Sequence, residues 1–381
     1  MRIIPVASGK GGVGKSLFSV NLAIALAEAG NRVLLADLDL GASNAHTVLG
    51  LRAVPKGIGC FFSDSDASID NLILDTEYSN LRFLPGEGEM PGLANIRTSQ
   101  KNRLIRQLRK QEADYLILDL GAGTSMTTVD FFLLSSEGIL ITTPNLTAIL
   151  NAYLFLKNAV FRLLSRSFPR KSPGRTIIEE ISADPGALQR IYLPTVFEKL
   201  KTADPENFER FNRLYRVFRP KLIMNMVEKP KDNLKAQKIK VSCQQYLGLE
   251  LDHYGVIYKD HLQDIALASR LPIIRYKRES LIPQAIYRIA EKIEQTAPSE
   301  TSGGEWNPEI EENYQTAERE AENDFEFRAA EIQKMIRSGV LTDSDFLELI
   351  RQQQYELKSL RNENRLLRNK LAAAIKQGFK I

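Results

Sequence analysis

Apolar residues gather in seven short runs between residues 2 and 257, and within these runs they alternate little with polar residues. The runs span 2–7, 32–36, 81–84, 115–118, 138–142, 221–226 and 253–257. Strands that are apolar on both faces are typical of a mostly parallel sheet with helices on both sides. Segments of helix length separate most of the runs, and in 17–29 the apolar residues recur at helical spacing. The pattern therefore predicts an α/β fold with a mostly parallel sheet flanked by helices.

The strand pattern is interrupted between residues 161 and 220. This segment has several prolines and two helical stretches, 193–200 and 207–218. We interpret about 161–220 as a helical insertion in a domain that spans 1–295. A helix predicted at 280–294 has isoleucines on one face and closes that domain.

The composition changes after residue 295. Residues 296–308 (TAPSETSGGEWNP) have the composition of a linker, and 309–341 form an acidic segment that we expect to be helical. A heptad seam then predicts a coiled-coil helix over 342–381, with apolar residues at seven of nine positions. The nine positions are Phe346, Ile350, Gln353, Leu357, Leu360, Asn364, Leu367, Leu371 and Ala374. A parallel dimer and an amphipathic helix folded onto its own domain are both open at this point.

Charge and cysteine content exclude several classes of protein. The net charge of +4 is unevenly distributed: 161–221 holds 13 Lys and Arg against 7 Asp and Glu, whereas 300–332 holds 2 against 11. The two cysteines form no CxxC pair, so a disulfide framework and a four-cysteine metal site are not expected. We find neither a signal peptide nor an apolar run of about 18 residues. We therefore expect a cytoplasmic protein, peripheral to a membrane at most.

Residues Gly9 to Ser16 read GKGGVGKS and match the phosphate-binding motif G-x-x-x-x-G-K-[ST]. The motif lies between the first predicted strand and the first predicted helix, which is the context it requires. The binding residues predicted here are Gly9, Lys10, Gly11, Gly12, Val13, Gly14, Lys15 and Ser16. Backbone N–H groups would surround the phosphates, Lys15 would neutralise them, and the Ser16 hydroxyl would bind Mg²⁺. ATP and Mg²⁺ are the cofactors that this motif predicts.

A second lysine in the motif, Lys10, resembles the deviant Walker A signature of the MinD/ParA family of ATPases. The resemblance extends over roughly residues 1–295, outside the insertion. It implies that Lys10 reaches the nucleotide of a partner subunit, so that ATP holds a homodimer together. A cation supplied by the partner offsets charge on the transferring phosphoryl group. Lys10 is thus a predicted catalytic residue.

Three further segments resemble the same family. In residues 34–44 (LLADLDLGASN), the resemblance implies that Asp39 orients the attacking water and that Asp37 lies near the metal. In residues 115–123 (YLILDLGAG), it implies that Asp119 contacts the water shell of magnesium. In residues 222–226 (LIMNM), it implies that Asn225 forms hydrogen bonds with adenine, and an amide can both donate and accept them.

Residues around the predicted site, and the region after residue 295, bear on which branch of the family the chain resembles. Residues 37–44 and 119–123 are most similar to the MinD branch, which includes regulators of the division site and FlhG-type regulators of flagellar number and placement. An activating protein partner is expected, although Asn151 stands where the family often has an acidic residue. Typical MinD proteins end in a short amphipathic membrane helix, which a linker and coiled coil replace here. A basic amphipathic tip around Phe379 leaves membrane contact open.

Two alternative functions are weighed against this one. A ParA-like segregation ATPase would bind DNA through basic residues, for which the chain offers Arg162, Arg166, Arg170, Lys171 and Arg175. A solvated basic face explains these residues more simply, so nucleic acid is the less favoured partner. An ATP-dependent amidase or ligase would need a pocket for a small acceptor. Iron–sulfur scaffold relatives use a CxxC motif that this chain lacks.

Overall fold

The order of the strands in the sheet determines which loops meet at its edges. The computed structural model describes residues 1–41, 43–51, 56–64, 66–86, 96–183, 191–296 and 308–337, together with Gln354 and Arg365. Residues 1–324 form one compact unit and 325–381 a second, and each is described by itself. Most of the predicted linker and the predicted coiled coil over 342–381 lie outside the described residues.

The sheet has eight strands in the order β3-β4-β2-β5-β1-β6-β7-β8 within the described chain. Their bounds are β1 Arg2–Ala7, β2 Val33–Leu38, β3 Leu74–Asp75, β4 Leu81–Leu84, β5 Tyr115–Leu120, β6 Ile139–Thr142, β7 Lys221–Val227 and β8 Asp252–Tyr258. All pairs are parallel except β3 with β4. The predicted fold class is confirmed, and the two-residue strand β3 is the addition that the hydrophobic pattern did not indicate.

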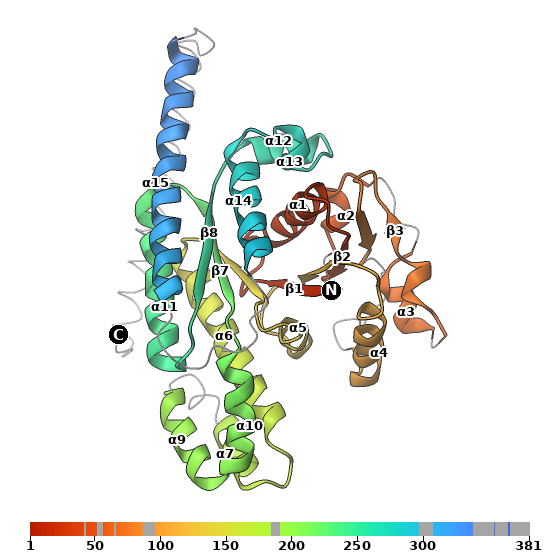
Figure 1. Cartoon of the computed structure of the whole chain (residues 1–381), viewed down its shortest axis with the longest axis vertical. Helices are drawn as coiled ribbons and strands as arrows, with labels where there is room; N and C mark the ends of the chain where they lie inside the picture. Colours follow the sequence, from red (N-terminus) through yellow and green to blue (C-terminus); the bar gives the residue numbers. More distant parts are fainter. Residues whose placement is uncertain are drawn as a thin grey trace. The chain divides into compact units, whose positions relative to one another are not determined.

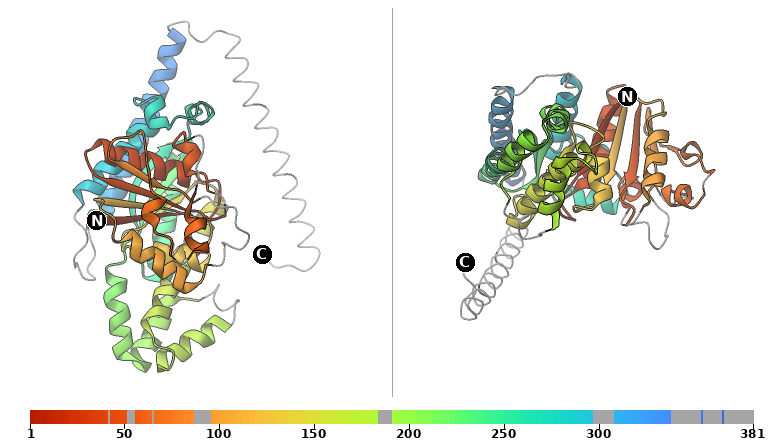
Figure 2. Two further views of the ribbon diagram at one scale, coloured as in Figure 1. Left: turned by 90° about the vertical axis from the view of Figure 1, so that its right-hand side faces the viewer. Right: turned by 90° about the horizontal axis from the view of Figure 1, so that it is seen from below.

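Helices cover both faces of the sheet (Figure 1). One face carries α1 Lys15–Glu28, α2 Ala45–Val48, α12 Leu262–Ala268, α13 Ile273–Tyr276 and α14 Leu281–Gln295. The other carries α3 Ile58–Ser63, η1 Ile69–Asn71, α4 Thr98–Leu108, α5 Met126–Phe132, α6 Leu146–Ser167, η3 Pro230–Asn233, α11 Leu234–Ser242 and the π-helix η4 Cys243–Leu247. Figure 2 shows the two layers from two further directions.

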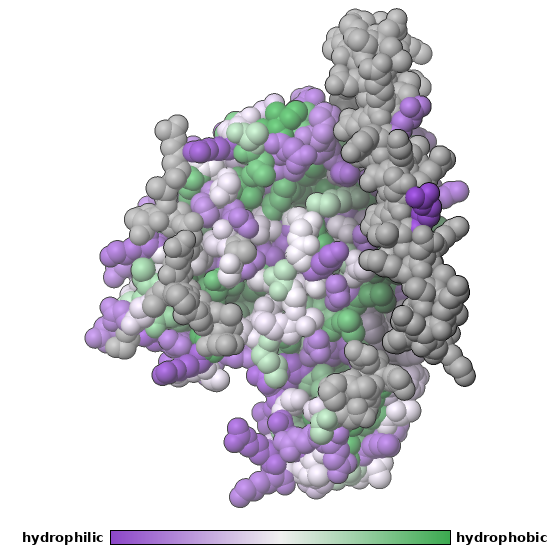
Figure 3. All heavy atoms as spheres, turned by 180° about the vertical axis from the view of Figure 1, so that it is seen from behind, coloured by the Kyte–Doolittle hydropathy of each residue, from purple (hydrophilic) through white to green (hydrophobic). Residues whose placement is uncertain are grey.

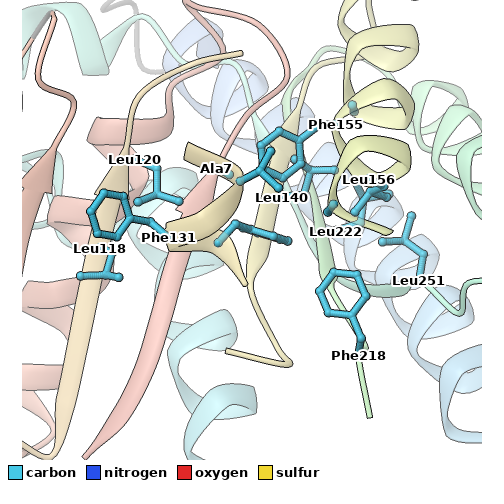
Figure 4. Packing of buried hydrophobic residues seen from close by; sticks show 14 of the residues in the cluster. Ala7, Leu118, Leu120, Phe131, Leu140, Phe155, Leu156, Phe218, Leu222 and Leu251 are labelled. Carbon is cyan, nitrogen blue, oxygen red and sulfur yellow. The ribbon is translucent and has the colours of Figure 1, made fainter. Parts of the chain in front are cut away.

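Each face of the sheet has its own hydrophobic core, because successive side chains of a strand point to opposite faces. In β5, Ile117 belongs to one core, whereas Leu118 and Leu120 belong to the other. Figure 4 shows part of the second core, where Phe131 of α5 lies beside the leucines of β5 and Phe155 of α6 lies beside Leu140 of β6. These contacts hold α5 and α6 against the sheet.

The segment between β6 and β7 is helical where it is described. It contains α6 and then α7 Pro173–Ala183, α9 Leu193–Ala203 and α10 Pro205–Arg216, and the predicted insertion begins within α6. The last three lie together beneath the sheet in Figures 1 and 2. Hydrophilic residues are prominent at this end of the surface in Figure 3. Phe197 of α9 packs against Phe211 and Tyr215 of α10 through one tilted and one edge-on ring contact.

The acidic segment begins a long helix, α15 Pro308–Arg337. Its residues up to Asp324 belong to the same compact unit as the sheet, which therefore extends beyond residue 295. Tyr314 donates a hydrogen bond to the Leu251 carbonyl, and Tyr258 donates one to the Ala321 carbonyl. Since β8 is the last strand in the sheet, this part of α15 covers an edge strand that would otherwise be open to pairing.

Candidate nucleotide-binding site

The sheet order places three sequence motifs at one edge. β2, β5 and β1 are neighbours and run parallel, so their carboxyl ends meet. Asp37 of β2 lies directly opposite Asp119 of β5, and Asp119 lies beside the last residues of β1. The glycine loop follows β1 at once. Ligands of open α/β sheets bind at this edge, so the geometry brings the predicted residues together where a ligand is expected.

The loop from Ser8 to Gly14 needs glycine at several positions, and at two of them a side chain would clash with a neighbouring residue. Gly14 has φ 86°, in the left-handed region, and a side chain there would also clash with the Asn225 amide. At Gly9 a side chain would clash with the Asn151 carbonyl of α6. Gly14 precedes Lys15, the first residue of α1, so the loop ends at the positive end of a 14-residue helix. This arrangement suits an anion such as phosphate.

Lys15 is buried beneath the loop, and its ammonium contacts a carboxylate. Its Nζ donates to Asp119 Oδ1 at 2.7 Å and to Ser16 Oγ at 3.2 Å, and it lies 3.9 Å from Asp39 Oδ2. Ser19 also donates to Asp119 Oδ1, at 3.0 Å. The structure thus brings Lys15, Ser16, Asp39 and Asp119 together. Ser19 was not singled out in the sequence, although it lies one helical turn after Lys15 on the same face.

Two buried carboxylates at this edge are short of positive charge. Asp119 is fully buried, and its Oδ2 is a buried atom with no hydrogen-bond partner in the described chain. Asp37 is also fully buried, and it accepts hydrogen bonds from the Asp39 and Ala45 N–H groups and from the Ser43 hydroxyl. Burial, followed by the nearby charge of Asp119, raises the pKa of Asp37 to about 6.

These groups fit a magnesium ion bound together with a nucleotide. An unpartnered carboxylate oxygen is the kind of hard oxygen ligand that Mg²⁺ takes, and the half-buried Ser16 hydroxyl lies nearby. No group of three or more His, Cys, Asp or Glu in the described part of the chain forms a metal cage. Such a cage is not required, because Mg²⁺ usually keeps several waters and uses one or two carboxylates plus substrate phosphates.

Lys10 and Lys15 lie in different surroundings although both belong to the loop. Lys10 is exposed, and its Nζ donates to Thr147 Oγ1 at 3.1 Å on the first turn of α6. Asn145 caps this helix by accepting from the Thr147 N–H. Lys15 is directed into the site, whereas Lys10 lies along its outer rim. Thr147 is a contact that the sequence did not indicate, since 137 residues separate it from Lys10.

Asn225 lies beside the loop at the end of β7. Its Nδ2 donates to the Val13 carbonyl at 2.8 Å, and the side chain is buried. An amide has a second N–H and a carbonyl oxygen, which this bond does not use. In this structure Asn225 therefore supports the glycine loop, and its predicted contact with adenine stays a prediction.

Comparisons with known proteins agree with this geometry. A family model of the ParA type, described as NUBPL iron-transfer P-loop NTPase, matches residues 1–157. The matched residues include the whole glycine loop, β2 and β5, so the similarity to this family covers the candidate site. The septum site-determining protein MinD of Synechocystis sp. is 38% identical over 154 residues, which are 40% of this chain and 56% of that protein. The antiactivator FleN of Pseudomonas aeruginosa is 29% identical over 191 residues, or 48% and 67%.

A similar fold is seen in solved structures. The chain is similar to the septum site-determining protein MinD complexed with Mg-ADP from Pyrococcus horikoshii, with a TM-score of 0.53 and 22% identity over 77% of this chain and 96% of that one. The chain spans about half the length of the curated MinD relatives it matches. In the described residues, no helix is both long and apolar enough to cross a membrane.

The basic residues offered for DNA binding are partly engaged within the protein. Arg162 and Arg166 of α6 form ion pairs with Asp130 of α5, at 2.6 and 2.5 Å. Arg175 pairs with Glu179 at 2.7 Å. Side chains held by internal carboxylates have less charge to offer phosphates, so this arrangement does not favour the DNA-binding alternative.

Proposed function

We propose that the chain is an ATP-driven dimerisation switch of the MinD type that controls spatial positioning, at a division site or in the placement and number of flagella. The observation that carries this proposal is the different placement of two lysines of one loop. Lys15 serves the site of its own subunit, and Lys10 lies on the rim, where it is available to the nucleotide of a second copy. The similarity to MinD and FleN supports the positioning role.

In this proposal each residue of the edge has a role. Residues 9–16 bind the phosphates of ATP. Lys15 moves its ammonium from Asp119 to the nucleotide and neutralises phosphate charge. Asp119 and Asp37, with the Ser16 hydroxyl, would hold a magnesium ion and its water shell, and the ion would neutralise charge on the phosphates. Asp39 orients the attacking water, and Asn225 contacts adenine. Hydrolysis to ADP and phosphate is slow until a protein partner stimulates it.

The test is the variant Lys10→Ala in the full chain. ATP affinity should stay within about twofold of the wild type, because Lys15 and the backbone N–H groups are intact. The ATP-dependent increase in sedimentation coefficient, measured against ADP, should be lost. ATPase activity per subunit should then no longer rise with protein concentration.

Lys15→Ala serves as the comparison, since it should lose ATP binding itself. If Lys10→Ala associates in ATP as the wild type does, the switch with a lysine supplied by the partner is wrong. A generic nucleotide-binding protein would then remain.

The finer parts of the proposal concern location and partners. We place the switch in the cytoplasm, in agreement with two cysteines that are not joined in a disulfide, and we allow for contact with the inner face of the cell membrane. A coiled coil of residues 342–381 either tethers two subunits or recruits a partner protein. A fluorescent fusion of the full chain, followed in cells, tests the location directly.

A further inference from the structure

Met226, near the end of β7, differs from the rest of its strand. β7 lies inside the sheet between β6 and β8, and every other residue of the strand is buried. Met226 is 37% exposed. Its φ is 55°, in the left-handed region that a residue with a large unbranched side chain rarely adopts. A large apolar side chain is thus held at the surface by an unfavourable backbone.

An extra residue in β7 accounts for this conformation. Met224 pairs with Val256 of β8. The next pair is Val227 with Tyr258, so β7 advances three residues where β8 advances two. This is a β-bulge, a feature that redirects side chains and is over-represented next to active sites.

The bulge brings two consecutive side chains to one place. In a regular strand, Asn225 and Met226 would point to opposite faces of the sheet. Here both reach Gly14 of the glycine loop. A side chain at Gly14 would clash with the Asn225 amide, and its Cβ would lie 3.7 Å from the methyl carbon Cε of Met226. The two side chains therefore lie together beside the loop, next to the residue that precedes Lys15.

The chemistry of the two side chains indicates which part of a nucleotide they meet. Phosphates bind through N–H groups and cations, and a thioether offers neither. The apolar part of a nucleotide is the flat face of its base, and methionine sulfur makes favourable contacts with aromatic rings. The Asn225 amide gives one N–H to Val13 and keeps its second N–H and its oxygen for the polar edge of a base.

We propose that Met226 is a binding residue for ATP that packs its side chain against the face of the adenine ring, while Asn225 contacts the edge. The proposal rests on the proposed function, in which Asn225 meets adenine. It gives a reason for the bulge and for the positive φ, because strained residues persist at ligand sites. The bound base removes an exposed apolar side chain from water, which favours binding.

Met226→Ala in the full chain removes the side chain beyond Cβ and leaves the backbone as it is. The affinity for Mg-ATP, measured by titration calorimetry, should fall at least about fivefold, because an apolar contact with the ring is lost. The affinity for ribose 5-triphosphate, which is ATP without its base, should change less than about twofold, because the loop is intact. Met226→Leu should bind ATP within about twofold of the wild type, since its volume is similar. Equal losses for both ligands, or no loss of ATP affinity, would overturn the proposal.

Met226→Gly separates the side chain from the strained backbone. Glycine adopts a φ of 55° without steric cost, so the variant should fold and keep the bulge. ATP affinity should fall as it does in Met226→Ala. Normal ATP affinity in Met226→Gly would show that the bulge serves Asn225 alone, which would also defeat the proposal. Arg270→Gly is the matched control: Arg270 has the same φ, packs against Gly50, and should leave the ratio of the two affinities unchanged.

Protection of the wild-type sulfur gives a test without substitution. Hydrogen peroxide oxidises exposed methionines to sulfoxides, which mass spectrometry quantifies residue by residue. Mg-ADP should slow the oxidation of Met226 at least about threefold, because the base covers the sulfur, whereas ribose 5-diphosphate should not slow it. Met1, which is 46% exposed and precedes the other end of β1, is the internal reference and should react equally in all samples. An equal rate for Met226 with and without ADP would contradict the contact.

The base contact and the switch can fail separately. Normal ATP binding by Met226→Ala, together with loss of association in Lys10→Ala, would remove the base contact and keep the switch. A selective loss of ATP affinity in Met226→Ala, in a chain that does not associate in ATP, would keep the base contact and remove the switch. A wild-type chain without affinity for ATP would remove both.

Discussion

Two buried aspartates of this protein lie eleven residues apart and are surrounded very differently. Asp130 of α5 is bound by Lys101 of α4 and by Arg162 and Arg166 of α6. Asp119 at the end of β5 has one buried lysine, Lys15, and keeps one oxygen without a partner in the described chain. The cations lower the pKa of Asp130 despite its burial. The protein pairs the Asp130 carboxylate with three cations, which makes this the saturated site, and it leaves one oxygen of Asp119 without a hydrogen-bond partner, which makes that the incomplete site.

The difference separates a structural role from a functional one. A carboxylate with three cations joins three helices and has no capacity for a further cation. A buried carboxylate with an unpartnered oxygen lowers the stability of the free protein. Such a cost is expected where a bound ligand supplies the missing partner. Incomplete pairing of buried groups is therefore the physical sign of the nucleotide edge, and it can be tested at both sites.

The largest effect is expected at the saturated site. Asp130→Asn leaves three cations without their common partner, so the free energy of unfolding in urea should fall by about 3 kcal/mol. ATP affinity of the folded protein should not change. Glu179→Gln, which removes the exposed partner of Arg175, should cost less than about 1 kcal/mol and is the control. Equal losses in the two variants would show that the Asp130 cluster contributes no more than a surface ion pair.

A smaller loss of stability, with a functional loss in addition, is expected at the incomplete site. Asp119→Asn should cost about 1–2 kcal/mol, because the new amide oxygen still accepts from Lys15, and Asp39 lies close to the same ammonium. Its ATP affinity should fall at least about tenfold in magnesium and change little in EDTA, since the lost carboxylate serves the ion. An equal loss in EDTA would contradict the magnesium role of Asp119.

Sequence periodicity was sufficient for the sheet and insufficient for the pairing of charges. Buried parallel strands are apolar throughout, so β1 and β4 were located at their observed bounds and the other long strands to within one or two residues. β3 was missed because two residues carry no periodic signal. The glycine motif located the loop by its spacing, and the roles of its residues stay predictions. The Lys10–Thr147 contact and the Asp130 cluster join segments that are distant in sequence, which local patterns do not encode.

The smallest effect expected is a change of stability with pH that originates at Asp37. Its pKa is about 6 in the folded protein and about 3.9 when unfolded. Between these values the folded state holds a proton that the unfolded state has lost, so stability falls as pH rises through this window and is recovered on acidification. Lowering the pH from 7 to 5 without nucleotide or magnesium should therefore favour the folded wild type over Asp37→Asn by about 1 kcal/mol.

The pH-dependent difference isolates this effect from others. Lost hydrogen bonds to Asp39, Ser43 and Ala45 lower the stability of Asp37→Asn equally at both pH values and cancel. Asp114 does not contribute to this difference, because its hydrogen bond with Arg32 lowers the pKa of Asp114 to about 2, and the stability from this pair is lost only as pH falls below about 4. If Asp37→Asn and the wild type keep the same difference in urea unfolding at pH 7 and pH 5, Asp37 is ionised throughout. Of these two aspartates, Asp119 alone would then lack full pairing at this edge of the sheet.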